Sequence, residues 1–578
     1  MERLSIQRFK PALVAGLALA LLLAVACGAP AAPSGTAPPA AVSNPQTTAP
    51  AASAPQQPVA TAAPIQQSEK SSPAQSQTEP TDSAIGARPT LKAGVIWLDS
   101  PLDPVEGGYV STQSALSETL FRLSGTTLSP EPWLATEATQ VDPMTWRIGI
   151  RTGVKFHNGN VMDAQAVKAS LERAIRLSPA AADTLSVDTI TVEDEQTITI
   201  TTTVQQPTLP GLLILPALAI TDAAAAETAG DGNFIDARAL TGPYIPTEYV
   251  PKEYLNSVAN DDYWGGTPPL AGIDHVAIPD TNSRELALQA GDIDVAVNVS
   301  PDGARAINAH AGTHTDTSGI GTSLVLWWVN FERGTLADPL VRRAVAHAID
   351  RESIAGLVAP PGSGSFAELL LPEVLTPCPG VNALGYDPDE ARSLLAQAGY
   401  ADSDGDGIVD KDGQPLEIII GGYPERFQLP IMAEAAQAML AEVGINAEVL
   451  ITEWSVVKEP AWDLFGWYNT VVQGGGDPVF NIGKFAGLKG DASGSGTNNY
   501  GHYDASGLVD IIAPSVSVTN LEGRKEIACE ALAVVTEEAA FLPVAHVNMV
   551  YGVSDRVIDF EAHPTSHYFF NHRVGLSE

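Results

Sequence analysis

A run of acidic residues between positions 402 and 412 has the composition of a cation site. Five aspartates fall within eleven residues, and Lys411 is the only basic residue among them. Mutual repulsion between these carboxylates favours a bound cation. Carboxylate and carbonyl oxygens are the ligands that Ca²⁺ takes in proteins. The alternative is a solvated acidic turn before the strand expected at 416–420.

The spacing within this run resembles the first nine positions of an EF-hand loop. The oxygens would come from Asp402, Asp404, Asp406, Ile408 and Asp410. Ile408 would offer its backbone carbonyl, and Gly407 stands where such a loop turns sharply. The twelfth position holds Gly413, so the usual bidentate glutamate is missing. We therefore expect at most a structural calcium ion and no required cofactor.

Cys27 is a second residue whose position implies chemistry. It follows a short basic segment and an apolar run over residues 11–26. That run is short for a bilayer span, so residues 1–26 are expected to be a signal peptide. The small residues before Cys27 resemble a bacterial lipobox, which implies cleavage before this cysteine and a diacylglycerol group on its sulfur. The alternative is an ordinary secretory signal with a chance cysteine, and both interpretations predict export.

The segment that follows Cys27 is expected to be a tether. Residues 28–86 consist mostly of Ala, Pro, Ser, Thr and Gln, with few charges and no aromatic residue. Such a composition cannot bury enough apolar surface to offset the entropy lost on ordering. We therefore expect residues 27–87 to hold a globular part near the lipid bilayer.

Charge and cysteine content narrow the possible partners. The formal net charge is −37, which disfavours nucleic acid as a partner. Cys378 and Cys529 remain after Cys27, and they either pair in an exported protein or stay as free thiols. The chain lacks a His-Glu-x-x-His zinc motif and a Gly-x-Ser-x-Gly nucleophile elbow, so two common types of exported hydrolase are disfavoured.

The elements that would position these residues alternate between strands and helices. The expected strands span 93–97, 147–151, 197–203 and 416–420, and the expected helices span 164–175 and 339–349. Asp387 is expected to cap a further helix, with Pro388 in its first turn and Gly399 at its end. Alternation of this kind predicts an α/β protein.

A series of segments follows the tether in a fixed order. They are Trp146–Arg151, Gly153–Gly159, Thr241–Tyr244, Tyr263–Gly266, Gly291–Asp294, Asp338–Ala344, Ala348–Arg351 and Tyr386–Asp389. The series resembles the family 5 extracellular solute-binding proteins, the peptide and nickel receptors of ABC importers. The resemblance covers nearly all of the chain after the tether.

The resemblance implies an α/β, two-lobed periplasmic-binding-protein fold of the large type II class, with an inserted subdomain. Lobe I would comprise residues 88–130, 240–325 and 545–578, and lobe II residues 326–544. The insert would span 131–239. We expect a monomer that works with ABC permease subunits and has no catalytic residues.

The same resemblance locates a candidate loop for the solute. In peptide-binding members an aspartate in a Gly-Trp…Asp-Tyr-x-Asp-Pro segment holds the peptide amino terminus. Here that position falls on Gly474, which weakens a standard oligopeptide interpretation. Asp477 either substitutes from a shifted loop or caps the turn before Pro478.

Aromatic residues near this loop are the better solute-binding candidates. The candidates are Trp327, Trp328, Asn330, Trp467 and Tyr468. If residues 327–331 form a strand, Trp327 and Trp328 point to opposite faces, so one face is expected to be core and the other to line the cleft. For the same reason, at most one of Trp467 and Tyr468 should face the cleft.

Our leading hypothesis is a receptor, anchored at the cell surface or periplasmic face, that closes its lobes on a solute without chemistry. Oligopeptides or dipeptides are the first candidates. Nickel chelates or short oligosaccharides are the alternatives within the fold. An exported enzyme or sensor that kept the fold is the alternative outside this class.

Overall fold

The computed structural model describes residues 88–577, except 231–233, 320, 360–361, 454–461, 472–473 and 487–498. The predicted signal peptide, Cys27 and the predicted tether lie outside the described residues. The described residues belong to one compact unit. None of the described helices combines the length and the apolar character that crossing a bilayer would need.

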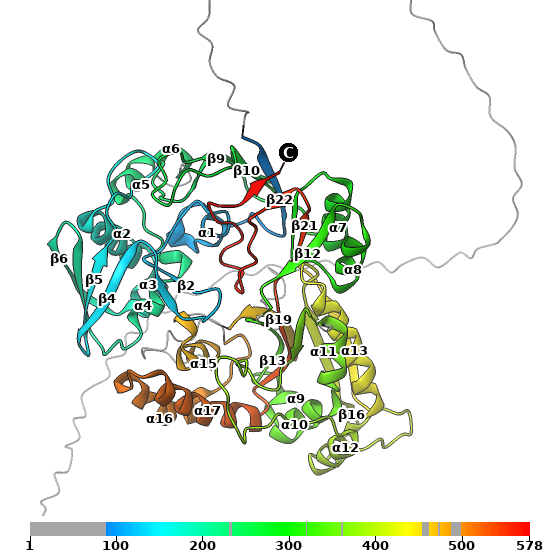
Figure 1. Ribbon diagram of the computed structural model, residues 1–578. Helices are drawn as coiled ribbons and strands as arrows, with labels where there is room; N and C mark the ends of the chain where they lie inside the picture. Colours follow the sequence, from blue (N-terminus) through cyan, green and yellow to red (C-terminus); the bar gives the residue numbers. More distant parts are fainter. Residues whose placement is uncertain are drawn as a thin grey trace, which may run out of the picture. The chain divides into compact units, whose positions relative to one another are not determined.

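A seven-stranded mixed sheet forms lobe I (Figure 1). Its strands, in spatial order, are β12 (Thr313–Thr317), β21 (Val550–Ser554), β11 (Val295–Val297), β1 (Thr90–Val95), β10 (Gly272–Ala277), β9 (Tyr254–Ala259) and β8 (Tyr244–Val250). Strand β1 pairs in parallel with both β10 and β11. The helices of this lobe are α1 (Tyr109–Gln113), α7 (Thr281–Ala290) and α8 (Pro301–Ala309). Short pairs also form between β2 (Phe121–Leu123) and β3 (Pro130–Pro132), and between β22 (Val557–Ile558) and β23 (Gly575–Leu576).

The inserted subdomain is a four-stranded antiparallel sheet with helices. The sheet order is β4 (Ala135–Asp142), β5 (Thr145–Ile150), β7 (Thr197–Thr202) and β6 (Val187–Asp194). Its helices are α2 (Ala164–Leu177), α3 (Pro179–Leu185), α4 (Leu209–Leu212), α5 (Ala223–Ala229) and α6 (Phe234–Ala237). Ile148, Ile198 and Ile200 are fully buried. They lie directly opposite one another or alternate along adjacent strands, so one face of the sheet forms the core of the insert.

A six-stranded sheet forms lobe II. In spatial order its strands are β14 (Gly364–Phe366), β20 (Phe541–Val547), β13 (Ser323–Val329), β19 (Leu464–Thr470), β17 (Glu417–Gly422) and β18 (Asn446–Ile451). Its helices are α9 (Gly334–Ala337), α10 (Pro339–Ala348), α11 (Arg351–Val358), α12 (Pro388–Gln397), α13 (Gln428–Glu442), α15 (Pro478–Ala486), α16 (Val509–Ile512) and α17 (Leu521–Glu537). A short hairpin joins β15 (Asp410–Lys411) to β16 (Gln414–Pro415).

Local sequence signals account for several of these elements. Helix α12 begins after Asp387, whose carboxylate accepts hydrogen bonds from the backbone of Asp389 and Glu390. Pro388 is its first residue, and Gly399 follows with a φ of +90°, a conformation that glycine adopts without strain. The capping prediction for this helix is confirmed.

Strand β13 is core on both faces. Trp327 and Trp328 are each 0% exposed. The Trp328 ring stacks on Phe485 of α15, with ring centroids 5.4 Å apart. Trp327 lies opposite Gly466 of β19, where Leu429 of α13 packs. Both faces of this strand are therefore buried, because helices cover a central strand of a mixed sheet on both sides. The expectation that one face lines the cleft stays a prediction.

The connections between the lobes lie at the ends of two strands of the lobe II sheet. Strand β13 begins at Ser323 and β20 ends at Val547, and both belong to the sheet of lobe II. Strand β21, which begins at Val550, belongs to the sheet of lobe I. The chain therefore crosses between the lobes just before β13 and between β20 and β21.

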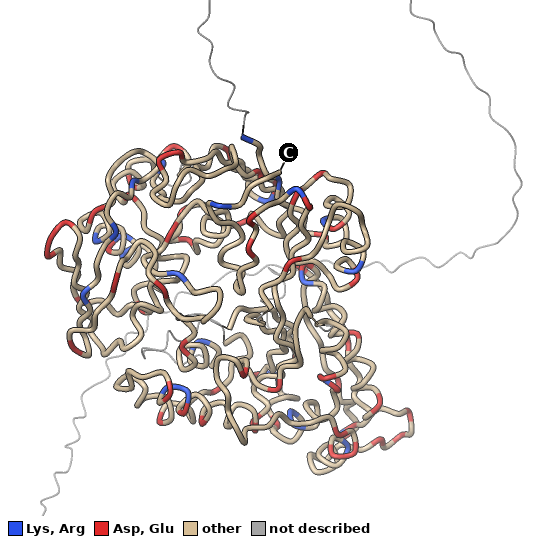
Figure 2. The backbone as a smooth tube through the Cα atoms, viewed as in Figure 1, with Lys and Arg blue, Asp and Glu red and all other residues tan. Residues whose placement is uncertain are grey.

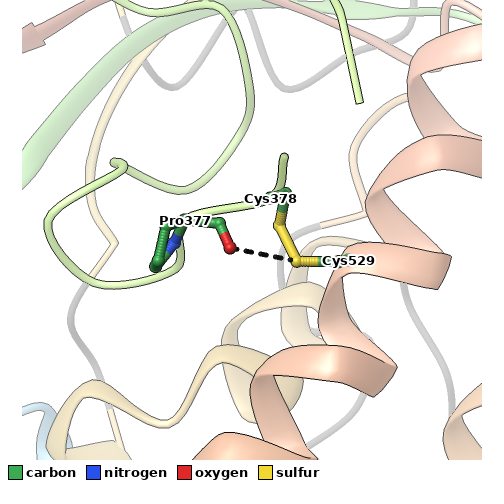
Figure 3. Close-up of a disulfide and its surroundings, with 3 residues drawn as sticks. All are labelled: Pro377, Cys378 and Cys529. Atoms are coloured by element: carbon green, nitrogen blue, oxygen red, sulfur yellow. Dashed lines mark hydrogen bonds between the residues drawn. A yellow bond between two sulfur atoms is a disulfide. The ribbon is translucent and has the colours of Figure 1, made fainter. Parts of the chain in front are cut away.

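A disulfide joins Cys378 to Cys529, 151 positions apart in sequence (Figure 3). Cys529 lies on α17, and Cys378 lies on the loop before α12. The carbonyl oxygen of Pro377 is 3.6 Å from the Cys529 sulfur. Because a disulfide sulfur carries no hydrogen, this is a packing contact. Of the two alternatives for these cysteines, the structure has the paired one.

Candidate solute-binding site

Arg426 occupies the seam between the two lobes. It lies on the connection from β17 to α13 and is 6% exposed. Its guanidinium carbon lies 4.5 Å from the ring centroid of Trp97 in lobe I and 4.0 Å from that of Tyr468 in lobe II. Among the described residues, its Nε and Nη1 atoms find no hydrogen-bond partner. A buried guanidinium is costly without partners, so this arrangement favours an incoming anionic group.

A second positive charge near Arg426 also favours an anionic group at this place. Burial, and secondarily the charge of Arg426, lowers the pKa of Arg284 to about 10. Arg284 donates to the backbone carbonyls of Ile278, Val297 and Asn298, so it is already held within lobe I. Two positive charges therefore lie close together, and two nitrogens of Arg426 have no hydrogen-bond partner among the residues that the structure describes.

Two buried tyrosines extend this region with polar groups. The hydroxyls of Tyr468 on β19 and Tyr551 on β21 have no hydrogen-bond partner among the described residues. Burial raises the pKa of Tyr551, and Tyr468 adds a smaller contribution, so the two side chains are neighbours across the lobes. The region thus combines a cation, aromatic faces and hydroxyl groups, which are typical of a site for a small polar solute.

A second group of titratable side chains joins lobe I to α15. The rings of Tyr109 and His567 lie 5.4 Å apart. Burial, then His563 and Lys484, lowers the pKa of His567 to about 3, so Lys484 of α15 lies near it. Burial also lowers the pKa of Lys484 to about 8. Tyr109 is 38% exposed, yet burial raises its pKa, which is typical of a side chain in a recess within the protein.

A cavity of about 730 Å³ spans both lobes beside the Arg426 loop. Pro424, Glu425 and Phe427 contribute from lobe II, and residues of α7 and α8 contribute from lobe I. The charged residues of its described lining are all acidic: Asp280, Glu285, Asp302 and Glu425. The cavity therefore favours positively charged groups. Arg426 is not part of the cavity lining, and its guanidinium lies instead against the rings of Trp97 and Tyr468.

The predicted solute-binding residues do not gather in one place. Tyr468 contacts Arg426. The half-buried Trp467 points to the opposite face of β19, and its ring centroid lies 5.0 Å from that of Tyr500. The fully buried Asn330 donates to the carbonyl of Trp462 and accepts from the backbone of Glu332. Trp327 and Trp328 are core residues, although their indole N–H groups have no partner among the described residues. The binding roles of these five residues stay predictions.

Asp477 is committed to a buried ion pair. Both of its carboxylate oxygens accept from Arg524 of α17, at 3.0 and 2.5 Å, and the two side chains are 4% and 5% exposed. Asp477 also accepts from the backbone of Val479, in line with the capping alternative. Since its charge is already neutralised, we favour a structural role for this residue over contact with a solute.

The acidic loop brings the carboxylates of its first three aspartates close together. Carboxylate oxygens of Asp402, Asp404 and Asp406 lie within 4.8 Å of one another, and the three residues are exposed. Asp410 accepts hydrogen bonds from the backbone and the hydroxyl of Ser403, which lower its pKa. Figure 2 shows acidic residues on the loop that projects next to α12 and β16.

Sequence reasoning missed Arg426, Trp97 and Tyr551. A usable signal existed for Arg426, because it is the first basic residue after β17, which pairs in parallel with β18 and β19. Ligands of α/β proteins commonly bind beyond the carboxyl ends of parallel strands. No local pattern marks Trp97 or Tyr551, because only the fold brings them to the same seam.

Comparison with known proteins identifies the family. The model of the bacterial extracellular solute-binding proteins, family 5 (Middle), matches residues 129–490. The chain belongs to this family.

Three similar proteins illustrate the family. The oligopeptide-binding protein AppA of Bacillus subtilis is 32% identical over 242 residues, which cover 39% of this chain and 43% of AppA. The nickel-binding protein NikA of Staphylococcus aureus is 24% identical over 449 residues, covering 76% of this chain and 84% of NikA. The solved structure of that NikA with Ni(L-His)₂ has a TM-score of 0.74 at 22% identity, covering 85% of this chain and all of the NikA chain.

These similarities establish the fold as that of a two-lobed periplasmic binding protein. The chain spans 43% to 66% of the length of AppA, of a heme-binding protein of Haemophilus influenzae and of a nickel-binding protein of Escherichia coli. The relatives bind peptides, heme or nickel according to their names, and the family is one of extracellular proteins.

Proposed function

We propose that this protein is the solute receptor of an ABC importer and holds a carboxylate-bearing solute through Arg426. The observation that carries the proposal is the buried guanidinium between rings of the two lobes, whose Nε and Nη1 have no hydrogen-bond partner within the part of the chain that the structure describes. A residue placed between two lobes binds its ligand most tightly when the lobes close. Binding then needs lobe closure and no bond chemistry.

Peptides and carboxylate-containing chelates both fit this anchor. A peptide ends in a carboxylate, and so does each histidine of the nickel complex in the S. aureus NikA structure. A relative of 23% identity was solved with agropinic acid. A neutral oligosaccharide offers no charge to the guanidinium, so the geometry favours oligopeptides, dipeptides or nickel chelates over sugars.

Replacing Arg426 with methionine should weaken solute binding by about 10- to 100-fold, because hydrogen bonds to charged groups contribute about 1.5–3 kcal/mol. Arg426→Lys should lose less, since it keeps the charge without the planar fork. Isothermal titration with solute recovered from the wild type measures the effect.

Arg122→Met is the matched control for this substitution. Arg122 also lies over an indole ring, that of Trp133 at 5.6 Å, but its side chain is 47% exposed and pairs with Glu131. Its loss should leave affinity unchanged. Wild-type affinity in Arg426→Met would remove Arg426 from the site, and release of a hydrolysed product would replace the receptor with the enzyme alternative.

We propose that Cys27 carries the lipid that anchors the protein. The support is the sequence around it, since residues 1–87 lie outside the described residues. Cys27→Ala should move the protein from the membrane fraction to the soluble fraction, because each buried methylene of the lipid contributes about 0.8 kcal/mol. Fractionation after a salt wash tests this, and a processed variant that stays on the membrane would contradict it.

We also propose a structural calcium ion in the loop 402–410. The spacing of the aspartates and the proximity of three carboxylates support it. Millimolar calcium should raise the melting temperature, because an ion bound to the folded state alone stabilises that state. Asp404→Ala combined with Asp406→Ala should abolish the rise. An unchanged melting temperature in the wild type would leave the loop as a solvated acidic turn.

A further inference from the structure

Helix α15 is buried on all sides, although it lies at the edge of lobe II. Eight of its nine residues are buried, and Lys484 is partly buried. A helix that is buried over most of its surface must pack against protein on more than one face. The two phenylalanines of α15 show which parts of the protein it packs against.

Phe485 and Phe480 belong to different cores. Phe485 stacks on Trp328 and is part of the core of lobe II. Phe480 is 3% exposed and belongs to the core cluster of the inserted subdomain, which also includes buried residues from the end of the first segment of lobe I. The other buried members of this cluster all fall between Leu120 and Ile220. One helix of lobe II therefore reaches across the seam and fills a position in the core of the insert.

The residues just before α15 closely approach the end of the first segment of lobe I and the inserted subdomain. A Cβ atom on Gly475 would lie 2.5 Å from Cγ of Pro130 and 2.6 Å from Cα of Gly211. On Gly476 it would lie 2.7 Å from the carbonyl oxygen of Leu128. Only glycine fits at such distances, and both residues have a positive φ. The Thr208 hydroxyl adds a hydrogen bond of 3.2 Å to Asp477.

Within lobe II, an ion pair and a disulfide connect this region to helix α17. The Asp477–Arg524 ion pair ties the start of α15 to α17, and the Cys378–Cys529 disulfide ties the loop before α12 to the same helix. Leu375 of that loop also packs against the core of the insert. The contact surface on lobe II is therefore preformed.

We infer that residues 475–480 form a latch by which lobe II clasps the inserted subdomain and holds the lobes together without help from the solute. This inference rests on the proposed function, in which the two lobes close on a solute. Because these contacts join lobe II directly to the protein on the other side of the seam, mostly through apolar groups, they set how much of the empty receptor is already closed. The closed fraction in turn scales the apparent affinity for any solute.

The test measures the distance between the lobes in the full chain without solute. Donor and acceptor dyes are attached through encoded non-cysteine handles at Val141 and Val509, which are 62% and 49% exposed, so the disulfide stays intact. Single-molecule energy transfer then reports the ratio of closed to open molecules. Phe480→Ala should lower this ratio at least about tenfold, since large-to-small core changes are among the costliest substitutions.

A second variant keeps the test decisive if Phe480→Ala fails to fold. Gly475→Ala removes no core side chain and should lower the ratio through its clash with Pro130. The matched control is Gly413→Ala, which has a similar φ of +71° but meets no atom within 4 Å, and it should keep the wild-type ratio. Wild-type ratios in folded Phe480→Ala and Gly475→Ala would overturn the latch. If isothermal titration detects no binding of the peptide or nickel–histidine probes to the wild type, that result counts against the receptor function and leaves the latch standing.

Discussion

Replacing Arg524 with methionine should lower the free energy of unfolding by about 3–5 kcal/mol, because it leaves Asp477 charged and buried without its partner. The arginine makes two hydrogen bonds to that carboxylate and a third, of 2.6 Å, to the carbonyl of Ser515. Both side chains of the pair are at most 5% exposed. Urea unfolding of the wild type and the variant measures the difference.

The double variant Arg524→Met with Asp477→Asn separates the charge from the packing. Asparagine keeps an oxygen that can accept the hydrogen bond from the backbone of Val479, but it has no charge that would be left buried without a partner. We expect it to recover a large part of the lost stability, since neutralising the orphaned group removes most of the penalty. A loss below about 1 kcal/mol in the single variant would mean that the pair behaves like a solvent-exposed one.

Glu118 should make the protein less stable as pH rises from about 4.5 to about 7. Its carboxylate accepts hydrogen bonds from Tyr263 at 2.7 Å and from Trp264 at 3.2 Å, which favour the charged form. Burial of this 0% exposed residue outweighs them and raises its pKa to about 7. The folded state then holds a proton that the unfolded state has lost, so the stabilisation is complete below about 4.5 and is lost by about 7. The change is on the order of 3 kcal/mol.

Glu118→Gln isolates this effect from that of other groups. Burial lowers the pKa of His157, His275, His546 and His563 to about 4, and these residues add stability as pH rises, in the opposite direction. The difference in unfolding free energy between wild type and Glu118→Gln cancels the histidines. We expect that difference to fall across the window, and parallel curves would show that Glu118 keeps an ordinary pKa.

The sequence allowed the fold to be predicted better than the site. The ordered motifs indicated a two-lobed binding protein, and capping at Asp387 placed α12 correctly. The faces of residues 327–331 were assigned on the condition that they form a strand, and the sequence does not give the place of such a strand in the sheet. Strand β13 lies between β20 and β19 and is covered by helices on both faces, so the side chains of Trp327 and Trp328 are both buried.

The site depends on contacts between residues far apart in sequence. Arg426 meets Trp97 across more than three hundred positions, and Asp477 meets Arg524 across 47. A lone aspartate before a proline suggests a ligand or a cap equally well until its partner is known. The buried arginine of α17 decides between these roles, and no spacing rule in the sequence connects the two residues.

The measurement that tests the receptor claim most directly is mass spectrometry of the solute that copurifies with the full chain, compared between wild type and Arg426→Met. Our account predicts that denaturing the wild type releases an intact small molecule with at least one carboxylate, and that Arg426→Met retains about tenfold less of it. A neutral molecule, a chemically converted product, or equal retention by both proteins would contradict the account.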